Sequence, residues 1–419
     1  MPQNPEEKSE EQNVTTSVLH YTELDSEQKK QRLIELAWVF TKLGTTAFGG
    51  PAAHIAMIDD EVVKQRKWMS QEKLLDLLGV TNLIPGPNST ELAIHVGLER
   101  GGWLGLAIAG ACFILPAMLI VWGLAAVYVQ YQALPQAGWL LYGIKPVIAA
   151  IVVQALWKLG KTAVKNRATL LTGLAVLILF GLGVNELLLL FLAGLAVMLV
   201  GNWKFAKDRL RKDRDPSTFL LLPVFHLPML NMLPFANLFA TSLATPTWAS
   251  VFLLFLKIGS VLYGSGYVLL AFLQKDLVER LHWLTSQQLL DAVAIGQFTP
   301  GPVFTTATFI GYLLAGNAGA IAATIGIFLP AFVLVAIVSP WVTKLRRSPY
   351  TAGFLDGLNV ASLALMAIVT WDLGRAALID GLTIAVALLS CVVLFRFKVN
   401  STWLVLAGGF IGFIAHTIR

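Results

Sequence analysis

Long apolar stretches follow one another along most of the chain, separated by short polar, glycine- or proline-containing segments. The apolar stretches cover residues 103–129, 138–157, 168–184, 186–200, 249–273, 318–343, 352–371, 376–395 and 402–415. Several of them reach the roughly 20 residues with which an α-helix crosses the hydrocarbon core of a bilayer. The pattern therefore predicts an all-α polytopic membrane protein in contact with the lipid bilayer.

An internal repeat organises these stretches. FTKLGTTAFGG (40–50) matches FLKIGSVLYGS (255–265) at an offset of 215 residues. The same offset, or one residue less, relates a tryptophan, a Pro-Gly-Pro tripeptide and a later proline in the two halves: Trp68 and Trp283, 85–87 and 300–302, Pro116 and Pro330. Self-similarity over such a length indicates two homologous repeats.

The repeat divides the chain into four parts that differ in composition. These parts are a polar N-terminal tail (1–35), a first repeat (36–201), a connector that is first basic and then proline-rich (202–248), and a second repeat (249–419).

Each repeat is predicted to contain about five spans plus a hairpin that is broken by Pro-Gly-Pro. Because such a hairpin adds no net crossing, each repeat crosses an odd number of times and the second is expected to be inverted. Loop charges agree: the basic loop at 158–167 has a mainly acidic counterpart at 372–380, whereas the uncharged 131–136 corresponds to the basic 344–347. Basic loops stay cytoplasmic. Inverted-topology repeats are typical of secondary transporters.

Composition and motifs narrow the class further. Apolar residues make up 56 % of the chain and charged residues 13 %, against about 25 % charged in soluble domains. We attribute the net charge of +6 to loops facing anionic lipid, not to nucleic-acid binding. Cys112 and Cys391 lie in apolar stretches, the six histidines are scattered, and no HExxH or GxSxG motif occurs. We therefore expect no disulfide framework, metal, cofactor or enzymatic activity.

The two Pro-Gly-Pro segments predict an anion site. A proline removes a backbone donor, and unpaired backbone groups at membrane depth survive only where protein or water satisfies them. A helix that restarts after Pro-Gly-Pro exposes N–H groups at its positive end, which suits an anion. The candidate ligands near the two breaks are Gly86, Asn88, Ser89, Thr90, Gly301, Thr305 and Thr306. A tight turn in a packed hairpin is the alternative interpretation.

Two lysines occupy equivalent positions inside the first span of each repeat, Lys42 and Lys257. An ionised lysine at mid-membrane costs roughly 2.5 to 3.5 kcal/mol on insertion scales, so a pair in register favours a functional role in binding an anion. Flexible glycine segments follow the lysines, and from these we add further candidates to the site: Gly49, Gly50 and Gly264.

Secondary candidates are titratable or polar groups near the same elements. Lys145 is a third cation, with Asn359 at its equivalent position, whereas Glu91 and His95 could carry a coupling proton. The aspartates Asp76 and Asp291 are titratable in the same sense. A role in helix packing or at the membrane interface is the alternative for each of these groups.

Three features of the first repeat recur in weaker form in the second: FGGP (48–51), the amphipathic stretch with Trp68 and the Pro-Gly-Pro at 85–87. Together they resemble the chromate ion transporter family in its long two-domain form. The resemblance implies a multi-pass protein of the plasma (inner) membrane that exports chromate and gives chromate resistance. Sulfate, an isosteric dianion, is the related candidate substrate. Ser265-Gly266 stands where Gly50-Pro51 stands in the first repeat, so we expect the halves to contribute unequally.

Other functions remain to be weighed against this resemblance. LGKT (159–162) is not a phosphate-binding loop, because Ala155 occupies the position of the required first glycine; this argues against an ATP-driven pump. A sulfate or general tetrahedral-oxyanion transporter and an anion channel would use similar helix ends, and both stay open. The sequence also leaves open whether the protein forms a homodimer.

If Lys42 and Lys257 supply charge to the substrate, replacing both with alanine should abolish transport while membrane insertion is retained. Labelled chromate flux in proteoliposomes measures the first effect, and the amount of protein recovered from membranes measures the second. Unchanged flux in the double variant would remove the lysines from the mechanism.

Overall fold

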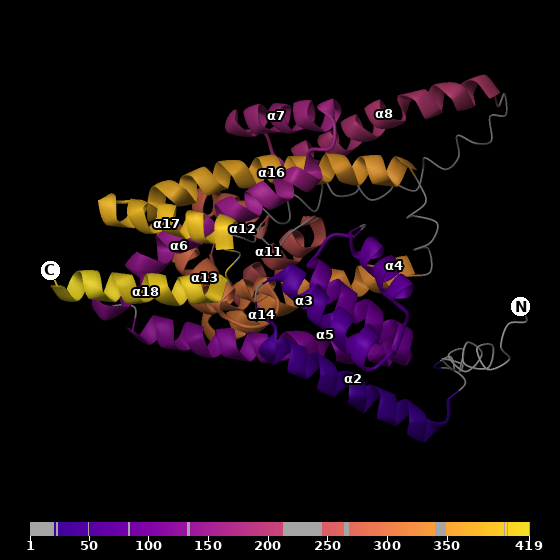
Figure 1. Ribbon diagram of the computed structural model, residues 1–419, viewed down its shortest axis with the longest axis horizontal. Coiled ribbons are helices and arrows are strands. Elements are labelled where there is room, and N and C mark those ends of the chain that lie inside the picture. Colours follow the sequence, from indigo (N-terminus) through magenta and orange to yellow (C-terminus); the bar gives the residue numbers. More distant parts are fainter. Residues whose placement is uncertain are drawn as a thin grey trace, which may run out of the picture.

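The computed structural model describes residues 21, 24–48, 50–82, 84–131, 135–212, 245–263, 268–339, 349–397, 399 and 401–418. Within these ranges every regular element is a helix (Figure 1). Four helices are long and apolar enough to cross a membrane: Asn88–Tyr131, Gly138–Ala163, Val303–Val338 and Tyr350–Ala377. Shorter apolar helices accompany them. The prediction of an all-α polytopic membrane protein is thus supported.

The helices of the two halves follow each other in the same order. The first half contains α2 (Ser26–Thr46), α3 (Pro51–Asp59), the π-helix η2 (Asp60–Gln65), α4 (Gln71–Thr81), α5 (Asn88–Tyr131), α6 (Pro135–Ala163), α7 (Arg167–Gly181) and α8 (Glu186–Lys212). The second contains α11 (Trp248–Val261), α12 (Leu269–Leu273), the π-helix η5 (Gln274–Arg280), α13 (Ser286–Phe298), the 3₁₀ turn η6 (Val303–Thr305), α14 (Thr306–Val338), α16 (Pro349–Ala377), α17 (Gly381–Phe397) and α18 (Ser401–Ile418).

Short polar side chains set where several helices begin. Asp25, Ser70, Asn166, Thr247 and Thr285 each accept a hydrogen bond from the backbone N–H three residues further on. Such capping satisfies one of the backbone donors that the first turn of a helix leaves unpaired.

The apolar stretch 249–273 is not one helix, in contrast to its continuous hydropathy. α11 ends at Val261 and α12 begins at Leu269. The first half has the same break, between Thr46 and Pro51. Hydropathy alone does not reveal it, because the residues around the second break remain apolar.

α5 and α14 each fold back on themselves. Gly102 and Gly316, at equivalent positions, both have φ 60°, a conformation that glycine adopts without strain. A Cβ on Gly97 would overlap the carbonyl oxygen of Gly105, whereas residues eight apart in a straight helix are separated by about 12 Å. The contact between Gly97 and Gly105 therefore closes a helical hairpin, and α14 repeats it between Gly311 and Gly319.

The two halves interlock through reciprocal contacts. α6 packs against α17 and α18, whereas its counterpart α16 packs against α7 and α8; Figure 1 shows α16 lying along α7 and α8. At the closest points Gly143 meets the Gly408 carbonyl, and Gly357 meets the Ala193 carbonyl. These two contacts are equivalent, as expected for two copies related by an approximate two-fold axis.

The hairpin contact allows a direct test of this packing. Gly105→Val should lower the stability of the folded protein, because the new side chain overlaps the opposite arm; overpacking of this kind costs about 1 to 3 kcal/mol. Thermal unfolding in detergent measures the effect. Gly123→Val is the matched control, since Gly123 lies on the same helix with open space around it. Equal melting temperatures for the two variants would contradict the hairpin.

Candidate functional site

Each Pro-Gly-Pro turn is hydrogen-bonded to the opposite half of the chain. The Gly86 N–H donates to the Leu262 carbonyl at 2.8 Å, and the Gly301 N–H donates to the Ala47 carbonyl at 2.9 Å. Leu262 and Ala47 are the residues that follow the last turns of α11 and α2. The two bonds are equivalent under the repeat, so each turn docks on the end of the other half's first helix.

Glycine is required at both turns. Gly86 and Gly301 have φ 141° and 85°, which other residues rarely adopt. A Cβ on Gly301 would lie 2.5 Å from the Ala117 Cβ and 3.0 Å from the Gly44 carbonyl oxygen. The turn therefore approaches the first half closely at backbone level.

Both turns lead directly into a helix start. α5 begins at Asn88 immediately after Pro87, whereas Pro302 is followed by η6 and then by α14. The residues of both turns are buried. The first N–H groups of a helix have no partner within that helix and favour an anion. Two such starts at the boundary between the halves are thus held inside the protein.

A histidine links the start of α5 to the end of α2. The Nδ1 of His54, on α3, lies 3.3 Å from the Ser89 hydroxyl, and its Nε2 lies 3.1 Å from the Ala47 carbonyl oxygen. The Asn88 side chain donates to the Asn82 side chain at 2.8 Å. His54 was not among the sequence candidates, because nothing in its local sequence separates it from the other scattered histidines.

Three buried side chains in the first turns of α5 have polar atoms that find no hydrogen-bond partner among the described residues. They are Thr90 through its hydroxyl, Glu91 through both carboxyl oxygens, and His95 through Nε2. Each side chain is at most 1 % exposed. Buried polar groups in folded proteins are normally bonded, so these atoms keep hydrogen-bonding capacity for a molecule at this helix start.

The second half differs at the corresponding helix start. The Thr305 and Thr306 hydroxyls donate to the carbonyls of Pro302 and Val303, each at 2.8 Å. With the offset of 214 residues that applies to the adjacent hairpin, Thr305 corresponds to Glu91. The two helix starts are therefore equivalent in backbone but not in side-chain chemistry.

Both site lysines are bonded to carboxylates. Lys42 forms an ion pair with Glu61 on η2, and Lys257 forms one with Asp276 on η5 at 2.9 Å. Each acid lies 19 residues after its lysine, so the acids are also equivalent under the repeat. The matched 19-residue spacing of each acid from its lysine is visible in the sequence, but Glu61 and Asp276 were not among the sequence candidates.

A second cation balances each acid. Arg66 pairs with Glu61, and Arg280 pairs with Asp276 at 2.9 Å. The Asp276 side chain is only 1 % exposed, so its charge depends on these partners. Each lysine thus shares its carboxylate with an arginine, and the group of Lys42, Arg66 and Glu61 keeps one net positive charge.

The third predicted lysine joins the two halves. Lys145, on α6, lies 3.0 Å from Asp291 and 2.6 Å from the Gln287 side-chain oxygen, both on α13. Tyr128 donates to the same aspartate at 2.8 Å. Asn359, at the equivalent position, is half-buried on α16.

The remaining candidates lie at the glycine breaks. Gly50, with φ 79°, caps the start of α3. Gly49 and Gly264 fall outside the described residues.

A sequence model of the family described as Chromate transporter matches the chain twice, over residues 34–199 and 249–413. This chain belongs to the chromate transporter family. The resemblance predicted from its motifs is thereby confirmed.

Full-length relatives of this transporter cover nearly the whole chain. The chromate transport protein of Cupriavidus metallidurans is 31 % identical over 92 % of this chain and 94 % of its own length. The probable chromate transport protein of Synechococcus elongatus is 33 % identical over 86 % and 89 %. An uncharacterized transporter of Bacillus subtilis, 28 % identical, matches only 34 % of this chain over 83 % of its own length. No solved structure matches.

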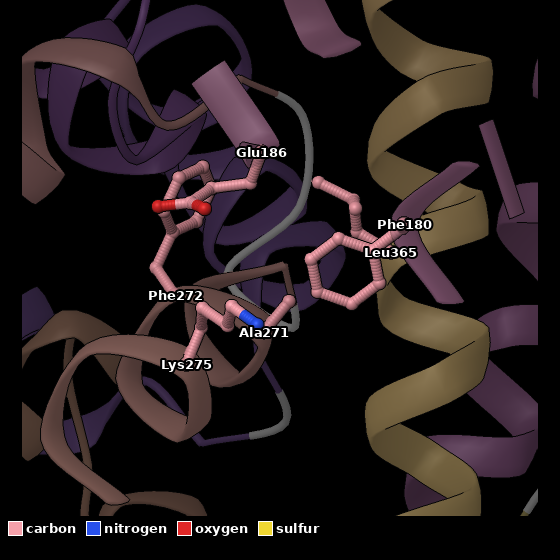
Figure 2. A pocket seen from close by; sticks show the side chains of 6 residues that line it. All are labelled: Phe180, Glu186, Ala271, Phe272, Lys275 and Leu365. Carbon is pink, nitrogen blue, oxygen red and sulfur yellow. The ribbon is translucent and has the colours of Figure 1, made fainter. Parts of the chain in front are cut away.

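The residues that line one small hollow of the structure are separate in the sequence from the Pro-Gly-Pro turns. Figure 2 shows its lining, which is Phe180, Glu186, Ala271, Phe272, Lys275 and Leu365. It leaves no space for a water molecule, so it is not a substrate site in this conformation. The described part of the chain contains no cluster of three His, Cys, Asp or Glu side chains that could hold a metal ion.

Removing Lys257 tests whether its charge serves the fold or the substrate. Lys257→Met should lower stability by about 1 to 3 kcal/mol, because Asp276 then loses one of its partners in a buried place. Adding Asp276→Asn removes that charge and should restore the melting temperature in detergent. A double variant with wild-type stability but no transport assigns the lysine to substrate binding. A double variant that also transports shows that the lysine serves only as a partner of Asp276.

Proposed function

We propose that this protein is a secondary active transporter that moves chromate outward across the plasma membrane and so gives chromate resistance. Membership of the chromate transporter family and similarity to proteins named chromate transport protein support the substrate. The apolar helices support a membrane location. The long transporter has no room in its described loops for a folded nucleotide-binding domain, because the connections between neighbouring helices there are short.

The observation that carries the proposal is the pair of exchanged hydrogen bonds between the Pro-Gly-Pro turns and the opposite helices. They hold two helix starts at the boundary between the repeats. In our proposal the oxyanion binds there, through the first N–H groups of α5 and the Thr90 hydroxyl, which has no hydrogen-bond partner among the described residues. Helix N-termini commonly bind tetrahedral oxyanions in this way.

In this proposal the lysines do not bond to the anion directly. Lys42 and Lys257 raise the local positive potential, and their carboxylate partners set how much of that charge reaches the substrate. The second helix start contributes its backbone N–H groups, since the hydroxyls of Thr305 and Thr306 already donate to carbonyls.

Alternating access follows from inverted repeats in this proposal. The odd number of crossings inferred for each repeat and the opposite loop charges support the inversion. The reciprocal contacts between the halves support an approximate two-fold relation between them. Movement of one repeat against the other would then open the shared site first to one side and then to the other.

Sulfate transport is the second candidate function. Backbone N–H groups and a hydroxyl recognise charge and tetrahedral shape, which chromate and sulfate share. An anion channel would use the same helix ends, but its flux would not saturate in the manner of a carrier.

The first test is labelled chromate flux in proteoliposomes with sulfate as competitor and an imposed pH or potential gradient. Saturable, gradient-dependent chromate flux that sulfate inhibits weakly supports a dedicated chromate carrier. Equal competition would make it a general oxyanion transporter, and non-saturating flux would make it a channel. The absence of flux from folded protein would refute the proposal.

Thr90→Val tests the proposed site. Loss of one hydrogen bond to a charged ligand should raise the KM for chromate by about tenfold or more, while stability is retained because the hydroxyl has no protein partner. Thr305→Val is the matched variant, since its hydroxyl is already bonded, and its KM should change less. An unchanged KM in Thr90→Val would place the anion elsewhere.

A further inference from the structure

Glu91 lies on the first turn of α5 and is completely buried. A Cβ on Gly86 would overlap its Oε1. The carboxyl group therefore occupies the niche beside the turn that the missing side chain of Gly86 leaves open. This niche adjoins the helix start at which the oxyanion is proposed to bind.

Neither carboxyl oxygen of Glu91 has a hydrogen-bond partner among the described residues. An ionised carboxylate buried without a donor is very unfavourable. The group is stable there only if it holds a proton or faces the positive end of the helix. An anion at that same helix end would compete with the carboxylate for the same N–H groups.

No lysine or arginine in the described part of the chain is bonded to Glu91. Tyr263 follows Leu262, whose carbonyl accepts from the Gly86 N–H, and α14 presents Ala331 next to Gly86. The other titratable or charged groups from neighbouring elements are His95 one turn further on α5, His54 on α3 through Ser89, and Lys73 on α4, which pairs with Glu99 at 2.9 Å. Repulsion between an oxyanion and an ionised Glu91 is therefore not offset by an ion pair at that carboxylate.

We propose that Glu91 carries a proton that is bound and transported together with the oxyanion, an inference that rests on the proposed function. The carboxylate takes up a proton on the side where the anion binds and releases it on the side where the anion leaves. The transported unit then has one negative charge less than the dianion alone. Proton and anion each increase the affinity for the other, because coupling between two sites is reciprocal.

Only the first repeat has a carboxyl group at this position of the sequence. At the offset of the adjacent hairpin, Thr305 corresponds to Glu91 and Phe309 corresponds to His95. The chain thus has a carboxyl group at one of its two helix starts, and we expect Glu91 to contribute one proton for each oxyanion.

The test measures the binding of chromate and of sulfate by calorimetry on purified full-length protein in lipid nanodiscs. Sulfate stays a dianion from about pH 6 to about pH 9, and chromate is used only above neutral pH, where it is a dianion. Wild-type affinity should fall as the pH rises through the titration of Glu91, approaching about tenfold per pH unit. Glu91→Gln, which resembles the protonated carboxyl group, should bind tightly at every pH. Glu99 is a half-exposed acid on the same helix, and the control variant Glu99→Gln should keep the wild-type dependence of affinity on pH.

A second readout does not depend on any variant. Anion binding to the wild type in weakly buffered solution should take up about one proton per anion when Glu91 is ionised beforehand. Equal pH slopes in wild type and Glu91→Gln, or no proton uptake by the wild type at any pH, would overturn the assignment while leaving chromate flux intact. Binding of neither anion by folded wild type would overturn both this inference and the proposed function.

Discussion

The structure depends on the need to satisfy backbone polar groups in an apolar interior. Two Pro-Gly-Pro turns interrupt the helices, and at membrane depth their free N–H groups require acceptors. Gly86 and Gly301 find them in carbonyls at the ends of α11 and α2, each in the opposite repeat. The same breaks that would destabilise an isolated span therefore tie the repeats together and leave two buried helix starts at their boundary.

A symmetric framework carries asymmetric chemistry. Both repeats share the turns, the folded-back hairpins and a lysine paired with an acid 19 residues later. The polar side chains near the turns differ: Glu91 and His54 in the first repeat correspond to Thr305 and Leu269 in the second. Symmetry in the framework suits a reciprocal motion of the repeats, whereas the asymmetry lets one half handle the proton and both halves handle the anion in our proposal.

The lysines show how a sequence reveals a costly charge inside a span but not the partner that stabilises it. The sequence singles out Lys42 and Lys257 because an ionised group inside a span is costly. The structure adds Glu61 and Asp276, which reduce that cost by pairing. Removal of a lysine held in this way is expected to lower stability, apart from any effect on binding, because it leaves a buried acid with one partner fewer. The double variant with Asp276→Asn separates these two effects.

The sequence by itself determined the helical membrane class, the repeat and the position of the two breaks, because apolar length, matched spacing and proline act locally along the chain. It also determined the family, through motifs that need no partner to be recognised. Only the tertiary structure decided that α5 folds back at Gly102, that each turn bonds to the opposite repeat, and that Glu91 is buried with no donor among the described residues. These features depend on contacts between residues far apart in the chain, for which a local pattern carries no information.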